Sequence, residues 1–209
     1  MLSLPKIYPI TDIRLSGLSH VEQVRKLIAG GATFVQLRDK RSSPREFYKQ
    51  AVECVRIAHD QNVQIIINDR VDIALVAKAD GVHLGQDDMP PEKARILLGA
   101  TAIIGFSTHS KEQVKLAASL PIDYIAIGPI FATSTKQNSD PRVGLDGLRD
   151  LKAAAGNLPV VAIGGINEAN LRDVFDVGAD SAAMIGAIVS AADQITSQMN
   201  HLTSLIDQK

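Results

Sequence analysis

The chain has 209 residues, a formal net charge of −1 at pH 7, a single cysteine and 4% aromatic residues. The near-zero net charge argues against nucleic acid or an anionic membrane as a partner, and the shortage of aromatic residues argues against stacking on single-stranded nucleic acid. A lone cysteine excludes an intrachain disulfide scaffold, which suits a reducing compartment. Because neither a signal peptide nor a membrane-spanning apolar run is expected, we predict a cytoplasmic protein, either a monomer or a homo-oligomer.

Short apolar segments rich in β-branched residues alternate along the chain with longer segments of helical periodicity. We expect eight strands, over residues 7–11, 34–38, 64–68, 81–84, 103–107, 124–128, 160–164 and 182–186. Helices are expected between them, for example over 21–29, 45–59, 111–119 and 171–177, the last with Asn167 before a start as early as residue 168. Cys54 falls within one of these helices among apolar residues, so we expect a buried core residue there rather than a nucleophile.

The junctions between these segments are also regular. Four phrases each end a helix and lead into a strand: Gly30-Gly31-Ala32-Thr33, Ala79-Asp80-Gly81, Pro121-Ile122-Asp123 and Gly178-Ala179-Asp180. Glycine is frequent at such points because the end of a helix commonly needs a left-handed residue. Strict alternation with apolar strands is typical of a parallel sheet covered by helices. Eight units favour closure into one (β/α)8 TIM barrel domain, residues 1–209, over an open doubly wound sheet.

Two aspartates lie where a barrel of this kind has its catalytic and ligand-binding side chains, at the C-terminal ends of the strands and in the loops that follow. Asp69 and Asp88 fall at the ends of neighbouring strands, so their carboxylates can converge at the mouth. Two carboxylates, completed by water and phosphate oxygens, are a usual site for Mg²⁺. The alternative is that each aspartate is the N-cap of the helix that follows, a position that Asp favours.

Basic residues accompany the two carboxylates. Arg38 and Lys40 alternate at the end of the second strand and so point to the same side. Lys136 follows a threonine-rich loop after the sixth strand, and Asn68 ends the third strand. Arginine grips phosphate with two hydrogen bonds, and lysine acts as a compact charge. With a metal these groups would suit a diphosphate; the alternative is a solvated charged rim, which we expect for Arg41.

A second anion site is expected after the seventh and eighth strands. Gly164-Gly165 and Gly186 lie where barrels of this kind often bind a phosphate through backbone N–H groups. Glycine permits close approach of the backbone to a ligand, although a tight turn would also explain the pair. We expect His83, within a strand, to be a core residue, and His109 either to contact substrate or to begin a helix.

Six phrases of this chain together resemble one family, thiamine phosphate synthase. They are Gln36-Leu37-Arg38-Asp39-Lys40, Ile67-Asn68-Asp69, Gly81-Val82-His83-Leu84-Gly85-Gln86-Asp87-Asp88, Gly105-Phe106-Ser107-Thr108-His109-Ser110, Gly128-Pro129-Ile130-Phe131-Ala132-Thr133-Ser134-Thr135-Lys136 and Ala162-Ile163-Gly164-Gly165-Ile166. They cover nearly the whole chain, in order, at the expected strand ends.

The resemblance implies a barrel enzyme that joins hydroxymethylpyrimidine diphosphate to hydroxyethylthiazole phosphate, or to its carboxylated form. The products would be thiamine monophosphate and pyrophosphate. The resemblance also implies that pyrophosphate leaves first, which gives a carbocation stabilised by the pyrimidine ring. Mg²⁺ would be the cofactor, and the partners would be small phosphorylated molecules.

The resemblance assigns a role to each matching position. Asp69 and Asp88 resemble the magnesium ligands, and the diphosphate contacts are Arg38, Lys40, Asn68 and Lys136. The pyrimidine contacts are Gln36 and Ser107, and the thiazole phosphate contacts are Thr133, Thr135, Gly165, Ile185 and Gly186. Catalytic roles fall to Lys136, Arg38 and Ser107.

Two positions depart from the family pattern. Gly186 stands where the family usually has serine, so one hydroxyl contact to phosphate is missing, and Ala132 stands where proline is common, in an expected lid over 132–143. Two alternative functions remain open. A thiazole tautomerase with the same barrel would need neither metal nor diphosphate, and a non-catalytic sensor of thiazole or thiamine phosphate would bind without turnover.

Overall fold

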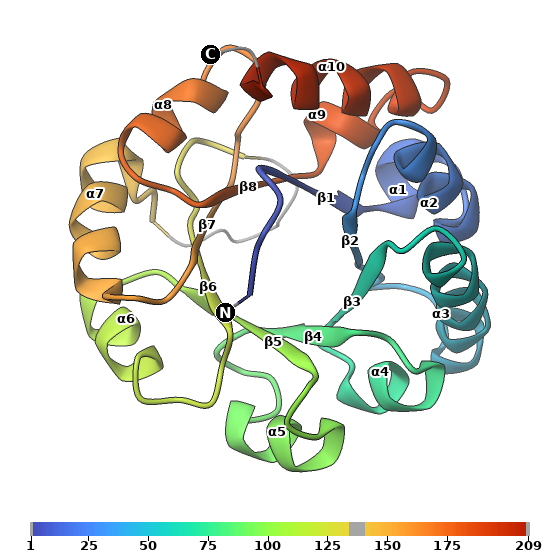
Figure 1. Ribbon diagram of the computed structural model, residues 1–209, viewed down its shortest axis with the longest axis horizontal. Coiled ribbons are helices and arrows are strands. Elements are labelled where there is room, and N and C mark those ends of the chain that lie inside the picture. The colour runs from blue at the N-terminus through green and yellow to red at the C-terminus, as the bar shows by residue number, and fades with distance from the viewer. Residues whose placement is uncertain (1, 134–140, 208–209) are drawn as a thin grey trace.

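The computed structural model describes residues 2–133 and 141–207 of the chain. Within them, eight parallel strands close into a barrel, in which each strand pairs with the next and β8 pairs with β1 (Figure 1). The strands are β1 (Ile7–Thr11), β2 (Phe34–Leu37), β3 (Gln64–Asn68), β4 (Gly81–Leu84), β5 (Ile103–Thr108), β6 (Tyr124–Ile127), β7 (Val160–Ile163) and β8 (Ser181–Met184). The eight predicted strands are confirmed, with ends that shift by one or two residues.

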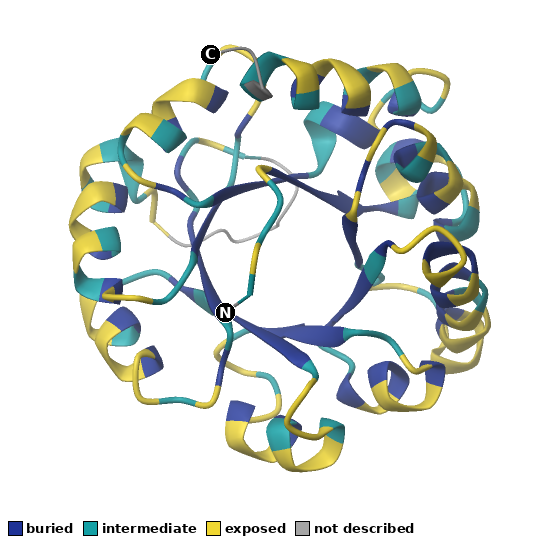
Figure 2. Ribbon diagram, in the orientation of Figure 1, coloured by how far each residue is buried: buried dark blue, intermediate teal, exposed yellow. Residues whose placement is uncertain are grey.

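Helices form a ring around the strands (Figure 1). They are α1 (Ile13–Ser16), α2 (His20–Ala29), α3 (Pro44–His59), α4 (Val71–Ala77), α5 (Pro91–Leu98), α6 (Lys111–Ala117), α7 (Gly144–Ala155), α8 (Leu171–Asp176), α9 (Gly186–Val189) and α10 (Ile195–Asp207). The main helices bury one side against the strands and expose the other, while the strands themselves are buried (Figure 2). Among the described residues, no helix has the length and apolar character needed to cross a membrane.

Apolar side chains form two cores, one inside the barrel and one between the strands and the helices. Tyr8, Phe34 and Tyr124 are the largest members of the inner core and are at most 1% exposed. Leu2 and Leu4 pack against the same cluster, and the N-terminal segment that carries them crosses the end of the barrel (Figure 1). This end, where the strands begin, is therefore filled, and ligands must enter from the other end.

The helix predicted over 171–177 does not extend back to residue 168, because asparagine side chains hold a turn before it. Helix α8 has Asn170 as its N-cap residue. Asn167 Oδ1 accepts the N–H of Ala169 at 2.9 Å, and the N–H of Asn167 donates to Asn170 Oδ1 at 2.8 Å. Such side-chain bonds to the backbone compete with helix formation. The expected start at residue 171 is therefore confirmed, and the earlier start at residue 168 was wrong.

An aspartate before each of β4, β6 and β8 fastens the start of the preceding strand. One carboxylate oxygen in each case accepts a backbone N–H near the beginning of β3, β5 or β7, at 2.7 to 2.8 Å. The pairs are Asp80 with Ile65, Asp123 with Ile104, and Asp180 with Val160. In these junction phrases the aspartate therefore contributes to the start of the strands as much as the glycine contributes to the end of the helices.

Each of these aspartates also contacts a basic side chain from a neighbouring helix. The partners are His59 for Asp80, Arg95 for Asp123 and Lys152 for Asp180. Because the bonds join a helix to two strands at the filled end of the barrel, they stabilise the scaffold and leave the opposite end free for chemistry.

We predict that Asp123→Ala lowers the free energy of unfolding by about 2 kcal/mol, because it removes the acceptor for Ile104 N–H and the partner of Arg95. Chemical denaturation measures this change. The control is Asp146→Ala, which removes a carboxylate that is 97% exposed and pairs with Arg149 of the same helix; it should change stability by less than about 0.5 kcal/mol. Equal effects of the two substitutions would contradict the role given to Asp123.

Candidate active site

A cavity of about 810 Å³ opens at the C-terminal ends of the strands. Predicted site residues from several strands line it: Gln36, Arg38, Lys40, Asn68, Asp69, Asp88, Ser107, Thr133, Gly165, Ile185 and Gly186. The structure therefore brings together every predicted site residue that it describes. Thr135, Lys136 and most of the expected lid lie outside the described residues.

The two predicted magnesium ligands face one another at the mouth. Asp69 has a φ of 62°, a left-handed conformation that aspartate adopts more readily than most residues, and its N–H donates to the His83 carbonyl at 2.8 Å. Asp88 Oδ2 accepts the N–H of Gly85 at 2.7 Å. Burial raises the pKa of Asp88, and the nearby Asp69 carboxylate raises it further. The site thus concentrates negative charge, which a cation would offset.

The alternative that these aspartates are helix N-caps is wrong. The N-cap residues of α4 and α5 are Arg70 and Pro90, and neither helix has a side-chain cap. Lys40 instead supplies a partner for the pair, since its ammonium group binds Asp69 Oδ2. No group of three or more His, Cys, Asp or Glu side chains that could hold a metal occurs within residues 2–133 and 141–207.

Arg38 is held at the mouth by a second carboxylate. Its Nη1 donates to Asp12 Oδ2 at 3.1 Å, where Asp12 follows β1 and is only 5% exposed. The N–H of Asp12 in turn donates to the buried Gln23 side chain at 3.1 Å. Sequence reasoning missed Asp12, because nothing in its local pattern distinguishes it from an ordinary residue that ends a strand.

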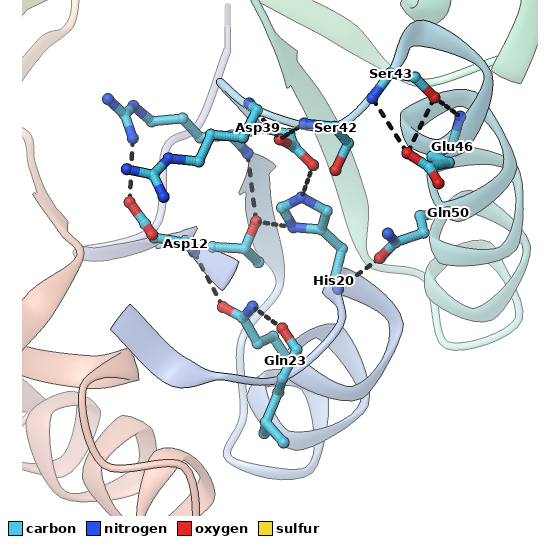
Figure 3. A network of polar contacts seen from close by, with 12 residues as sticks. Asp12, His20, Gln23, Asp39, Ser42, Ser43, Glu46 and Gln50 are labelled. Carbon is cyan, nitrogen blue, oxygen red and sulfur yellow. Dashed lines mark hydrogen bonds and ion pairs between the residues drawn. The ribbon is translucent and has the colours of Figure 1, made fainter. Parts of the chain in front are cut away.

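A buried histidine ties down the loop that carries Arg38 and Lys40 (Figure 3). His20, at the start of α2, is 0% exposed and contacts Thr11 Oγ1 through Nδ1 at 2.7 Å and Asp39 Oδ2 through Nε2 at 3.2 Å. The same threonine hydroxyl accepts the N–H of Arg38 at 3.3 Å. One histidine therefore links the end of β1 to the beginning of the loop after β2.

Asp39 closes this loop on itself. Its Oδ1 accepts the N–H groups of Arg41 and Ser42, both at 2.9 Å. Burial opposes ionisation, but the hydrogen bonds from Ser42 and Arg41 outweigh it and hold the pKa of Asp39 at about 2. Burial lowers the pKa of His20 despite the opposing effect of Asp39. A neutral His20 then donates from Nε2 to Asp39 and accepts at Nδ1 from Thr11.

Two further histidines, His83 and His109, line the cavity. His83 is 7% exposed, as expected of a core residue, and its two ring nitrogens contact Tyr124 Oη and Ser107 Oγ, each at 2.9 Å. His109 contacts the Gly128 carbonyl at 2.6 Å and lines the cavity, while Ser110 is the N-cap of α6. The interpretation of His109 as a helix start was therefore wrong.

Close packing alone requires glycine at position 165. Its φ is 65°, and a Cβ atom there would lie 2.4 Å from the Ala132 carbonyl oxygen and 2.8 Å from Phe131 Cβ. The loop after β6 is bonded to the same turn, since Phe131 N–H donates to the Gly164 carbonyl at 2.9 Å. A valine at position 165 would displace that loop, so this substitution cannot isolate phosphate binding.

Cys54 is 0% exposed, and burial raises the pKa of its thiol to about 12. A thiol that stays protonated in the core is not a nucleophile. The expectation of a core residue is confirmed.

Comparison with known proteins agrees with this geometry. A family model described as thiamine monophosphate synthase matches residues 7–188. A thiamine-phosphate synthase of Chloroflexus aurantiacus is 44% identical over 202 residues, which cover 96% of this chain and 92% of the relative. One of Vibrio parahaemolyticus is 45% identical over 204 residues, 97% and 98% of the two chains. The solved structure of thiamine phosphate pyrophosphorylase from Pyrococcus furiosus superposes with a TM-score of 0.87 at 37% identity, covering 97% of this chain and 96% of that chain.

The buried position of His20 makes stability depend on pH in a defined direction. Since the folded-state pKa is lowered, the unfolded chain takes up a proton below about pH 6.5 that the folded protein does not. Below about pH 6.5 the free energy of unfolding then falls as the pH falls, and His20 accounts for at most about 1.4 kcal/mol per pH unit of this decrease. Above about pH 6.5 the contribution of His20 to stability does not change with pH. Denaturation of the wild type and His20→Gln between pH 8 and 5 should give curves that diverge below about pH 6.5; parallel curves would contradict this assignment.

Proposed function

The chain belongs to the thiamine monophosphate synthase family, and from that premise we propose how its barrel mouth makes thiamine phosphate. The protein is a transferase of thiamine biosynthesis. The observation that carries the proposed mechanism is the convergence of two carboxylates and two basic side chains at the mouth: Asp69, Asp88, Arg38 and Lys40.

The reaction transfers a pyrimidine methylene group from oxygen to nitrogen. The bond between this carbon and the diphosphate oxygen breaks, and the electron pair leaves with pyrophosphate. The thiazole nitrogen then donates its lone pair to the methylene carbon, and the ring becomes a thiazolium cation. No proton has to be removed from either reacting atom, so the enzyme needs neither a base nor a covalent nucleophile at this step. It must neutralise the leaving group and align the two rings.

The carboxylate pair supports a magnesium site. Asp69 and Asp88 offer hard oxygen ligands, and their mutual repulsion raises the pKa of Asp88 beyond the effect of burial. A bound Mg²⁺ would neutralise charge on the diphosphate oxygens, from which it would take its remaining ligands together with water. Asp69 and Asp88 would hold the ion, and Asn68 would contact the diphosphate beside it.

Arg38 and Lys40 would take the charge that develops on the leaving group. Lys40 is paired with Asp69, so a cation shared by the two aspartates would release its ammonium group toward the diphosphate. Arg38 is oriented by Asp12 and presents a planar donor to phosphate oxygens. We extend the same role to Lys136, as the family resemblance implies.

The thiazole phosphate would bind on the opposite side of the mouth, after β6, β7 and β8. Thr133, Gly165, Ile185 and Gly186 line the cavity there. Backbone N–H groups at such positions are suited to phosphate, and we include Thr135 on the family resemblance. The two anion sites would then hold the two substrates on either side of the cavity, with the pyrimidine against Gln36 and Ser107.

The alternatives fit these residues less well. A tautomerase has no use for a diphosphate site, yet Asp69, Asp88 and Lys40 are clustered as such a site requires. A sensor would gain nothing from groups aimed at a leaving group. We also propose that the protein acts in the cytoplasm, in keeping with the biosynthetic role of its relatives.

The experiment that tests this function is the incubation of purified protein with hydroxymethylpyrimidine diphosphate and thiazole phosphate, with and without Mg²⁺. Thiamine monophosphate and pyrophosphate should form in equal amounts, and only with the metal. Parallel assays compare the carboxylated thiazole phosphate. Tight binding of thiazole phosphate without product would favour the sensor, and conversion of the thiazole alone would favour the tautomerase.

Removal of one proposed metal ligand should lower turnover without weakening the binding of thiazole phosphate. We predict that Asp88→Asn lowers kcat roughly 100-fold or more, while the Kd for thiazole phosphate changes less than about twofold. Asparagine retains an oxygen that can accept the Gly85 N–H, which alanine would lose. The control is Asp87→Asn, whose kcat should stay within about threefold of the wild type; an Asp88→Asn enzyme with full activity at limiting Mg²⁺ would refute the ligand assignment.

The missing serine at position 186 gives a gain-of-affinity prediction. A Cβ atom at Gly186 would meet only Ser190 Oγ, at 3.4 Å, so a serine fits without displacement. We predict that Gly186→Ser binds thiazole phosphate about tenfold more tightly, because one hydroxyl donor is added to a charged acceptor. Gly186→Ala, which adds bulk alone, should not improve the Kd by calorimetry. If serine and alanine behave alike, residue 186 does not contact the phosphate.

A further inference from the structure

A continuous chain of hydrogen bonds crosses the inside of the barrel at the floor of the cavity. Gln36 Nε2 donates to the hydroxyl of Tyr8 at 2.8 Å, and the hydroxyls of Tyr8 and Tyr124 are 3.0 Å apart. Tyr124 Oη lies 2.9 Å from His83 Nδ1, and His83 Nε2 lies 2.9 Å from Ser107 Oγ. The chain thus joins Gln36 to Ser107; Tyr8 and His83 line the cavity as well, and Tyr124 links them from behind.

Tyr124 is the central member of this chain. It is 0% exposed, and it is absent from the residues lining the cavity over the described part of the chain. Its contact with His83 depends on Gly105, because a Cβ atom there would lie 2.1 Å from Tyr124 Cζ and 2.5 Å from His83 Nδ1. Any effect of the Tyr124 hydroxyl on a ligand must therefore pass through Tyr8 or His83.

The chain has a defined order of donors and acceptors. Each tyrosine hydroxyl has one proton to donate, and a neutral imidazole has one. Since Gln36 donates to Tyr8, the order in which every hydroxyl proton finds an acceptor within the chain has Tyr8 donating to Tyr124, and Tyr124 to His83 Nδ1. The proton of His83 then lies on Nε2 and is donated to Ser107. Reversal would require all of these groups to reorient together.

We propose that Tyr124 is a positioning residue that fixes the hydrogen-bonding sense of the pyrimidine site. Through the chain, Gln36 presents its Oε1 as an acceptor to the cavity, and Ser107 presents its hydroxyl proton as a donor. This inference rests on the proposed function for the identity of the ligand ring, and on the pairing of every proton within the chain for its order.

The ligand that matches this pair of groups carries a donor beside an acceptor in one plane. An amino group next to a ring nitrogen, as in an aminopyrimidine, donates to Gln36 Oε1 and accepts from the Ser107 hydroxyl. An oxopyrimidine presents a carbonyl and a ring N–H in the same places, so both contacts are mismatched. A site with buried polar partners rejects such a ligand strongly, because its own groups are left unpaired.

The test compares two probes, the hydroxymethyl aminopyrimidine and its oxo counterpart, by calorimetry, and then the two diphosphates by kcat/KM. The wild type should prefer the amino form. Tyr124→Phe retains the ring and its packing but breaks the chain, so the preference should fall by about tenfold, the loss of one oriented hydrogen bond. Tyr8→Phe breaks the chain at the next link and should act in the same direction, which keeps the test decisive if one variant folds poorly.

The control is Tyr48→Phe on α3, whose side chain is 40% exposed, and which should leave the preference unchanged. A purely structural role would weaken the binding of both probes equally. The proposal would therefore be overturned if Tyr124→Phe left the preference for the amino probe unchanged, with or without an equal loss of affinity for both. A wild type that binds both probes alike would overturn it as well. Failure to form thiamine phosphate would count against the proposed function instead, since the binding comparison needs no turnover.

Discussion

Closure of the sheet, made by the pairing of β8 with β1, is the constraint on which the other features rest. Closure gives the strands a common inside and a common mouth, so residues that follow different strands meet at one end. The aspartates before β4, β6 and β8 fasten the opposite end, where the N-terminal segment packs against the inner core. Stability and chemistry are thereby separated along the barrel axis.

Electrostatics divide the mouth into two kinds of surface. Asp69 and Asp88 concentrate negative charge, and Lys40 partly balances it; in the proposed function this side binds the cation and the diphosphate. Deeper in the cavity, His83 is held neutral by burial, and its neighbours are uncharged hydroxyl and amide groups. A developing carbocation would meet oriented dipoles there, and the opposing charges would remain with the leaving group.

The sequence was sufficient for the fold, because eight apolar segments separated by helical segments allow few other arrangements. It was also sufficient to place Asp69 and Asp88 at the same mouth, since strand ends can be located from the alternation. It could not identify Asp12 or His20, whose partners Arg38 and Asp39 come from another strand end and depend on how α2 lies against the barrel.

The interior chain was harder still to predict. Tyr8 and Tyr124 are separated by 116 positions, and each looks like an ordinary aromatic core residue in its own strand. Only the register of the closed sheet brings their hydroxyls together. The prediction that α8 begins at residue 168 was wrong for a local reason, since Asn167 and Asn170 form a turn where a helix was expected.

The central claim is that the mouth binds a diphosphate together with a divalent cation. The most direct measurement is the affinity of the protein for inorganic pyrophosphate, by calorimetry, in the presence and absence of Mg²⁺ at constant ionic strength. The account predicts binding that strengthens at least tenfold with the metal, the effect of about 1.4 kcal/mol or more. Equal affinity under the two conditions would contradict it.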